Sequence, residues 1–151
     1  MKITAMAVMA MMVGTGTFAN PHVSDVEVLN NPKVITALKS IWTQSAFGVL
    51  NVEATFRLDG SASDYRIVVV PSTNQFMRQV VPVVSGITFA VFHVHPMRGQ
   101  PDPSQTDKNV ADTYQLKIYT IHVRGLYEYD PVTKQTTKLR DGVDWMKRVQ
   151  R

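Results

Sequence analysis

The sequence contains no cysteine, so neither a disulfide bond nor a lipid-modified cysteine can be present. It also has no run of Lys and Arg longer than two residues, and its formal charge is only +4, which argues against a nucleic-acid-binding stripe. No uninterrupted apolar stretch reaches the roughly 20 residues that a membrane-spanning helix needs. The folded chain must therefore be held together by packing.

The first 19 residues have the pattern of a secretory signal peptide. Lys2 supplies the positive start, residues 3–13 form a short apolar core, and Thr17 and Ala19 place small residues at the cleavage-determining positions. We expect cleavage after Ala19. The sequence thus predicts an exported protein, periplasmic or secreted, with no stable membrane insertion once the signal is removed.

Residues 20–45 are interpreted as a lead-in followed by the first helix. Residues 20–30 are polar and predicted to be irregular, whereas Asn31 and Pro32 form an N-cap and a favoured first-turn proline. The apolar residues that follow recur with the spacing of one helical face, namely Val34, Ile35, Leu38, Ile41 and Trp42. This pattern predicts a helix over residues 32–44, with Trp42 in the core.

Alternating and apolar runs predict strands over residues 48–58, 65–70, 87–95, 117–123, 126–129 and 136–139. In the first of these, Glu53 lies on the polar face, and residues 59–64 form a turn cluster. Further helices are predicted over residues 75–80, 104–115 and 143–149. The result is a single α+β domain, an α/β sandwich with a curved, largely antiparallel or mixed sheet flanked by two or three helices.

One motif in the second half of the chain has the spacing of metal ligands. His93 and His95 alternate along a predicted strand and so point to the same face, and Asp107 lies at the start of the next helix. Each residue also has an ordinary structural explanation, since Ser104 and Asp107 resemble a helix capping box. The joint pattern of two His, Pro, Ser and Asp arises by chance at only about one starting position in a few million. We therefore favour a metal site.

The segment His93-Val94-His95-Pro96, followed by Ser104-Gln105-Thr106-Asp107, resembles the JAMM motif of the JAB/MPN metalloprotease family, with its spacing intact. The resemblance extends from about Ala46 to Tyr129, within a predicted domain over residues 46–151 whose last part is a C-terminal extension. It implies an α/β sandwich that binds one Zn²⁺ per chain through His93, His95 and Asp107. It also implies that the Ser104 hydroxyl assists the oxyanion and that a glutamate from an earlier strand is the general base.

The donor chemistry supports the same interpretation independently. Two imidazoles and one carboxylate leave one position open on a four-coordinate Zn²⁺, which is typical of a catalytic site. Zn²⁺ at such a site lowers the pKa of its bound water, and a general base then accepts the proton of that water. The sequence has three glutamates: Glu27 lies in the lead-in and Glu128 follows the motif, so Glu53 is the candidate base, with a solvated strand carboxylate as its structural alternative.

These features predict an exported, zinc-dependent hydrolase of peptide or isopeptide amide bonds. Its substrate would be a peptide, a protein or a cell-wall peptide. A zinc-bound but non-catalytic module that binds peptide or cell wall is the alternative from another class, and a purely structural domain is the third. His122 is interpreted as an ordinary strand residue, because nothing in the sequence places its face near the metal.

Overall fold

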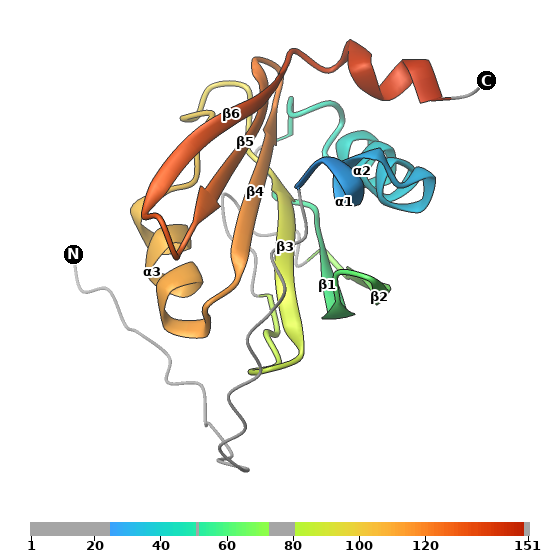
Figure 1. Ribbon diagram of the computed structural model, residues 1–151. Helices are drawn as coiled ribbons and strands as arrows, with labels where there is room; N and C mark the ends of the chain where they lie inside the picture. The colour runs from blue at the N-terminus through green and yellow to red at the C-terminus, as the bar shows by residue number, and fades with distance from the viewer. Residues whose placement is uncertain (1–24, 51, 73–80, 150–151) are drawn as a thin grey trace.

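The computed structural model describes residues 25–50, 52–72 and 81–149. The helices are α1 (Asp25–Asn30), α2 (Pro32–Gln44), α3 (Gln105–Tyr114) and the short 3₁₀ helix η1 (Asp144–Val149). The strands are β1 (Thr55–Ser61), β2 (Asp64–Val70), β3 (Thr88–Val94), β4 (Lys117–His122), β5 (Gly125–Asp130) and β6 (Gln135–Asp141). They form one six-stranded sheet in the order β2-β1-β3-β4-β5-β6 (Figure 1). Only β3 and β4 are parallel neighbours, so the sheet is mixed and the predicted α+β sandwich is confirmed.

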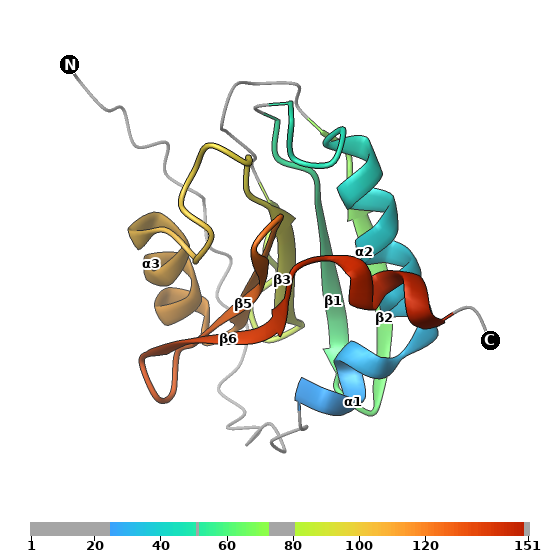
Figure 2. The same cartoon turned by 90° about the horizontal axis from the view of Figure 1, so that it is seen from above.

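Helices cover both faces of this sheet. Figure 2 shows α1, α2 and η1 on one side and α3 on the other. On the α2 side, Phe56, Phe92 and Tyr119 stack across three neighbouring strands, with ring centroids 4.6 and 4.3 Å apart. These rings and the apolar face of α2 form the main core. This face is therefore closed by large apolar side chains.

Helix α2 forms as its capping signal predicts. The Asn31 side chain accepts a hydrogen bond from the Lys33 backbone N–H at 2.9 Å, and Pro32 occupies the first turn. The apolar stripe of α2, including Trp42, is buried against the sheet. The predicted bounds of this helix and the core position of Trp42 are both confirmed.

The loop after α2 is tied to the segment that follows β3. Ala46, Phe47 and Gly48 all have positive φ angles, and a Cβ at Gly48 would lie 3.2 Å from the Trp42 ring, so glycine suits this position both conformationally and sterically. The Gly48 carbonyl accepts a hydrogen bond from the Met97 N–H at 2.8 Å. The chain just beyond His95 is thereby fixed to the end of α2.

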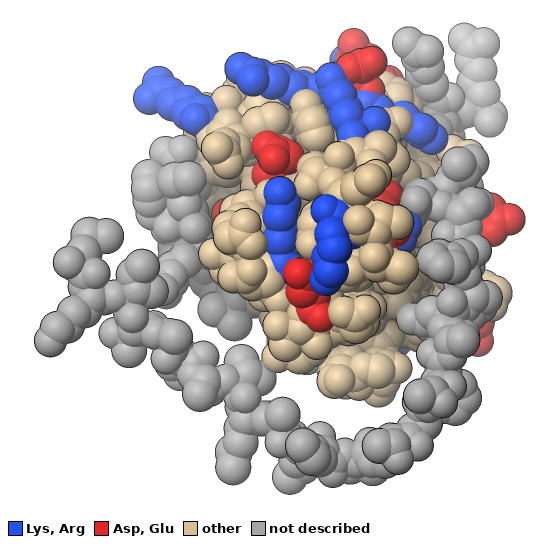
Figure 3. All heavy atoms as spheres, turned by 60° about the vertical axis from the view of Figure 1, so that its left-hand side comes forward, with Lys and Arg blue, Asp and Glu red and all other residues tan. Residues whose placement is uncertain are grey.

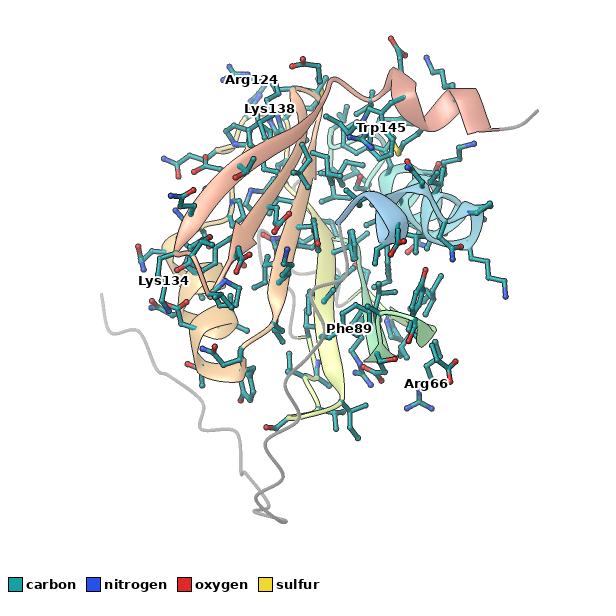
Figure 4. All side chains as sticks on the ribbon, viewed as in Figure 1. Arg66, Phe89, Arg124, Lys134, Lys138 and Trp145 are labelled. Carbon is teal, nitrogen blue, oxygen red and sulfur yellow. The ribbon has the colours of Figure 1, made fainter. Side chains whose placement is uncertain are left out.

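Helix α3 crosses over between the parallel strands β3 and β4 and packs on the second face. Its Ala111 is buried with Val91 and Ile118 in a smaller apolar cluster. Asp112 accepts a hydrogen bond from the Tyr129 hydroxyl at 3.0 Å and pairs with Lys134 at 2.8 Å. Figure 4 shows Lys134 beside α3. The β5–β6 hairpin thus helps to hold α3 in place.

Several predicted boundaries were wrong. Residues 25–30 form α1 instead of an irregular lead-in, because Val28 and Leu29 are buried in the main core. Strand β1 begins at Thr55 and not at residue 48, since its partner β2 ends at Val70 and Pro71 follows. The predicted turn at residues 59–64 is narrower, because the pairing of β1 with β2 continues to Ser61 and Asp64.

The C-terminal segment also differs from its prediction. Residues 144–149 form a 3₁₀ helix, in which the Met146 N–H bonds the Val143 carbonyl three residues earlier, and Met146 packs in the main core. The predicted helix at residues 75–80 lies outside the described residues. Within the described ranges, no helix is both long and apolar enough to cross a membrane.

Candidate metal centre

Two histidines, one in β3 and one directly after it, lie at the centre of the sheet. β3 lies between β1 and β4, and His93 is paired with Thr55 on one side and Thr120 on the other. His95 follows directly after the strand, and its N–H still bonds the Ile121 carbonyl at 2.9 Å. His93 and His95 are 4% and 8% exposed, respectively. Both imidazoles are therefore buried and carried by firmly paired backbone.

The loop after β3 fixes the tautomer of His95. Its Nδ1 lies 2.7 Å from the Gln100 carbonyl oxygen, which can only accept, so Nδ1 carries the proton. The same loop is anchored to β4, because the Thr120 hydroxyl donates to the Pro101 carbonyl at 2.7 Å. His95 Nε2 is consequently left with a lone pair. Histidines that bind a metal through one ring nitrogen commonly donate the N–H of the other nitrogen to a carbonyl or carboxylate in the same way.

Asp107 is positioned by the N-terminus of α3. Ser104 is the N-cap, and its hydroxyl accepts a hydrogen bond from the Asp107 N–H at 3.2 Å, while the Ser104 N–H donates to Asp107 Oδ2 at 2.7 Å. The capping box suggested by the sequence is therefore present. It also points the carboxylate toward the two histidines, so the structural and the functional interpretations of Asp107 are compatible.

The three side chains converge on one point. The Nε2 atoms of His93 and His95 are 2.9 Å apart, and each lies 3.6 Å from an oxygen of Asp107. Donor atoms that bind a tetrahedral Zn²⁺ at about 2.0–2.1 Å are separated by about 3.3 Å, so the observed spacings bracket that value. Two imidazole nitrogens this close also repel unless a proton or a metal ion lies between them. The donor set fits a metal ion.

Electrostatics at the centre favour a cation. Burial acts to lower the pKa of His93, but the Asp107 carboxylate, with a contribution from Glu53, outweighs it and raises that pKa. Burial would raise the pKa of Asp107, but His93, His95 and the Ser104 hydroxyl together hold it well below the usual range. Asp107 is thus a carboxylate ready to bind a positive charge.

The predicted base, Glu53, lies at the same site. It precedes β1 and lines a cavity of about 120 Å³ on the second face. The polar residues that line this cavity come from the segment before β1 and from β1, β3 and α3; they are Glu53, Thr55, His93, Thr106 and Asp107. The structure therefore brings Glu53 together with two of the three predicted ligands, although it is not within a strand.

The hydrogen bonds of the Ser104 hydroxyl differ from those expected of an oxyanion donor. Its hydroxyl donates to Asp107 Oδ2 at 2.6 Å, and Ser104 is not among the residues that line the cavity. Its observed contacts orient the Asp107 carboxylate. An oxyanion role requires the hydroxyl to turn away from Asp107 toward a bound substrate.

Three further residues at this face were not assigned to the site from the sequence. Thr55 and Thr106 line the cavity, and the predicted alternation already put Thr55 on the same face as Glu53. His122 also lies on this face, because β4 pairs directly with β3; its Nδ1 accepts from the Arg124 N–H at 3.1 Å. Its Nε2–H therefore faces the Met97 carbonyl at 3.3 Å, and burial lowers its pKa, so it is a neutral supporting residue.

Basic side chains gather on the surface at one end of the sheet. Figure 3 shows Lys and Arg side chains gathered along its upper margin, and Figure 4 places Arg124 and Lys138 at the corresponding end. Arg124 follows β4, so these cations lie at the end where β3 and β4 finish. Lys138 is paired there with Asp141, so the charge at this end is partly balanced.

Comparison of the chain with protein-family models, with curated proteins and with solved structures found no match.

Proposed function

We propose that this chain is an exported, zinc-dependent hydrolase of peptide or isopeptide amide bonds, of the JAMM type. The observation that carries the proposal is the convergence of His93, His95 and Asp107 beside a cavity that Glu53 also lines. Three protein ligands with one open position are the donor set of a catalytic zinc site. A purely structural site is normally closed by a fourth protein ligand.

The protein residues have separate tasks in this reaction. Zn²⁺ at this centre would supply a Lewis acid and a water whose pKa is brought toward neutrality. Glu53 accepts the proton of the attacking water and delivers it to the leaving amine, because it is the carboxylate of this cavity that is not assigned to the metal. Ser104 keeps the Asp107 carboxylate aligned and, on turning, donates to the developing oxyanion.

The test of the proposal separates metal binding from turnover. Glu53→Gln keeps the size of the side chain but removes the base, so we expect unchanged zinc content and a loss of about 10²–10⁴-fold in hydrolysis. The assay is cleavage of a proteome-derived peptide library and of purified cell-wall peptides, read by mass spectrometry. Glu27→Gln, at an exposed position of α1, is the matched control and should retain activity.

Two outcomes would redirect the proposal. If zinc-loaded Glu53→Gln hydrolyses the library at the wild-type rate, Glu53 is not the base. If the wild-type protein binds zinc but cleaves neither library while still binding one of them, the non-catalytic peptide- or cell-wall-binding module is the better description.

Export is the part of the proposal that rests on the sequence alone. We expect protein recovered from the cell envelope or the medium to begin at Asn20, because Thr17 and Ala19 mark the cleavage site. Mass spectrometry of the intact protein checks this. A mature chain that still begins at Met1 and stays inside the cell would remove export from the proposal.

A further inference from the structure

The cavity beside the candidate metal centre has an apolar half that the proposed hydrolysis does not use. Opposite its polar lining, its wall is aliphatic and is formed by Val81, Val83, Val91, Val110 and Ile118. These residues come from β3, β4, α3 and the segment before β3. An aliphatic pocket that opens next to metal-binding groups is the usual arrangement of a substrate-binding site.

This wall is held in place by the surrounding fold. Val91 and Ile118 are buried in the second apolar cluster, against which Val81, Val83 and Val110 pack. The segment before β3 is also fixed by polar contacts: Arg57 donates to the Pro82 carbonyl, and the Val84 N–H donates to the Thr88 hydroxyl at 3.1 Å. The cavity is therefore bounded by packed or hydrogen-bonded residues.

The size of the cavity limits what it can hold. An apolar protein cavity of about 150 Å³ is large enough for benzene, and a water molecule occupies about 30 Å³ in the liquid. By this measure, a cavity of about 120 Å³ suits three or four aliphatic carbons better than an aromatic ring together with its linking carbon. A side chain of the size of valine, leucine or isoleucine fits this space.

Thr55 gives a second, independent indication of a ligand. Its side chain lines the cavity and is 0% exposed, and its Oγ1 has no hydrogen-bond partner among the described residues. Buried hydroxyl groups are nearly always hydrogen-bonded, and an exception calls for an explanation. Thr55 is the β1 residue directly paired with His93, so its unpartnered hydroxyl belongs to the strand next to the candidate metal centre.

We propose that this cavity is a specificity pocket for an aliphatic side chain of three or four carbons on the residue next to the scissile amide. The Thr55 hydroxyl, which a small side-chain shift must first expose, hydrogen-bonds to the amide group of the same substrate. The inference rests on the proposed function, because it places the reacting amide at the metal centre. It adds the class of substrate, which is a peptide with a Val-, Leu- or Ile-like residue at the cleavage site.

The first test measures binding of hydroxamates to the zinc-loaded protein by calorimetry, since a hydroxamate places its amide-like group on the metal. Acetohydroxamate has no side chain, isovaleryl hydroxamate has an isobutyl group and phenylacetyl hydroxamate has a benzyl group. Each buried CH₂ adds several-fold in affinity. We expect isovaleryl hydroxamate to bind at least tenfold more tightly than either of the others. Equal affinities of acetohydroxamate and isovaleryl hydroxamate would overturn the pocket.

Two variants test the aliphatic wall and the Thr55 hydroxyl separately, and a third is a control. Val110→Phe fills the aliphatic half, so it should abolish the preference for isovaleryl hydroxamate over acetohydroxamate. Val132→Phe, at an exposed position on the β5–β6 turn, is the matched control and should keep this preference. Thr55→Val keeps the shape but removes the hydroxyl, so both affinities should fall about tenfold with their ratio kept. Unchanged affinities in Thr55→Val would remove Thr55 from the site.

A second measurement does not depend on zinc or on turnover. Isobutanol is titrated into the metal-free protein, and the methyl NMR signals of Val91, Val110 and Ile118 are followed. We expect saturable shifts with isobutanol and weaker binding of benzyl alcohol. No saturable shift would overturn the pocket even if the protein hydrolyses amides. Saturable shifts in a protein that hydrolyses nothing would retain the pocket and reject the proposed function.

Discussion

The two faces of the sheet are built from adjacent residues of the same strands, yet one is filled and the other is not. On the α2 face, the row Phe56, Phe92 and Tyr119 packs ring on ring. One residue along each strand, the row Thr55, His93 and Thr120 faces α3 and carries hydroxyl and imidazole groups. The comparison shows how a small domain combines stability with chemistry. The filled face supplies rigid strands, and the same backbone presents the polar groups.

The same comparison explains why the polar face keeps a cavity. Large side chains close the α2 face, whereas α3 contributes only Ala111 as a fully buried apolar residue. Helix α3 is oriented by polar contacts near both of its ends, of Asp107 with the two histidines and of Asp112 with Tyr129. A helix held at its ends need not pack tightly along its length, so space remains above His93. Substitutions on the two faces should therefore have different consequences.

The largest expected effect on stability is at the centre of the filled face. Phe92→Ala should lower the free energy of unfolding by about 3–5 kcal/mol, because it opens a cavity between two stacked rings. His93→Ala, one residue further along β3, should cost much less in metal-free protein. Urea unfolding of both variants without zinc measures the difference. Equal decreases in the free energy of unfolding would contradict the view that the α2 face provides most of the stability and the α3 face provides the reactive groups.

A smaller effect is expected for the buried ion pair at the far end of the second face. Burial opposes the charge of Asp59, but hydrogen bonds from Arg57 and Thr88 outweigh it and lower the pKa of Asp59 below its usual value. A lowered folded-state pKa stabilises the protein above the unfolded pKa of about 3.8 and loses this contribution as the pH falls through the folded-state value. Asp59→Asn should cost about 2–3 kcal/mol at neutral pH.

The pH dependence of the Asp59 effect is the sharper test. The difference in unfolding free energy between the wild type and Asp59→Asn should shrink as the pH is lowered below about 4. Urea titrations at several pH values measure it. Asp64→Asn, at an exposed position of the same hairpin, is the control and should show little difference at any pH. A difference for Asp59→Asn that is constant down to acidic pH would contradict the assignment.

The smallest expected effect on stability is at the cap of α3. Ser104→Ala removes a hydroxyl that contacts Asp107 twice and should cost about 1 kcal/mol. It should also weaken zinc binding, by about 10–100-fold, because the ligating carboxylate loses its orienting partner. Ser104→Thr keeps the hydroxyl and should restore both properties. Zinc affinity that is unchanged in Ser104→Ala would separate the cap from the metal centre.

The elements that the sequence predicted well carry local signals. Helix α2 has an Asn-Pro start and a complete apolar stripe, and α3 has its capping box, so both bounds were predicted to within a residue. Helix α1 forms because its side chains pack against residues distant in the sequence, and β1 starts where its partner β2 ends. Alternation of polar and apolar residues predicts neither feature. Local patterns define elements better than they define where a partner strand stops.

The candidate site divides in the same way. The ligands His93, His95 and Asp107 could be grouped from one continuous motif. Glu53 could be proposed only by elimination, and His122 was not assigned to the site. Both follow from the pairing of β3 with β1 and β4, which local sequence patterns do not predict. The aliphatic pocket could not be predicted either, since its wall comes from four separate segments.

The most direct test of this account is the zinc content of the purified chain after removal of metals and reconstitution. The wild-type protein should hold one Zn²⁺ per chain, and His95→Ala and Asp107→Ala should hold none while remaining folded by circular dichroism. His122→Ala, a histidine of the same face that is not a ligand, should still bind one. A wild-type protein that holds no zinc, or ligand variants that bind it as the wild type does, would contradict the metal centre.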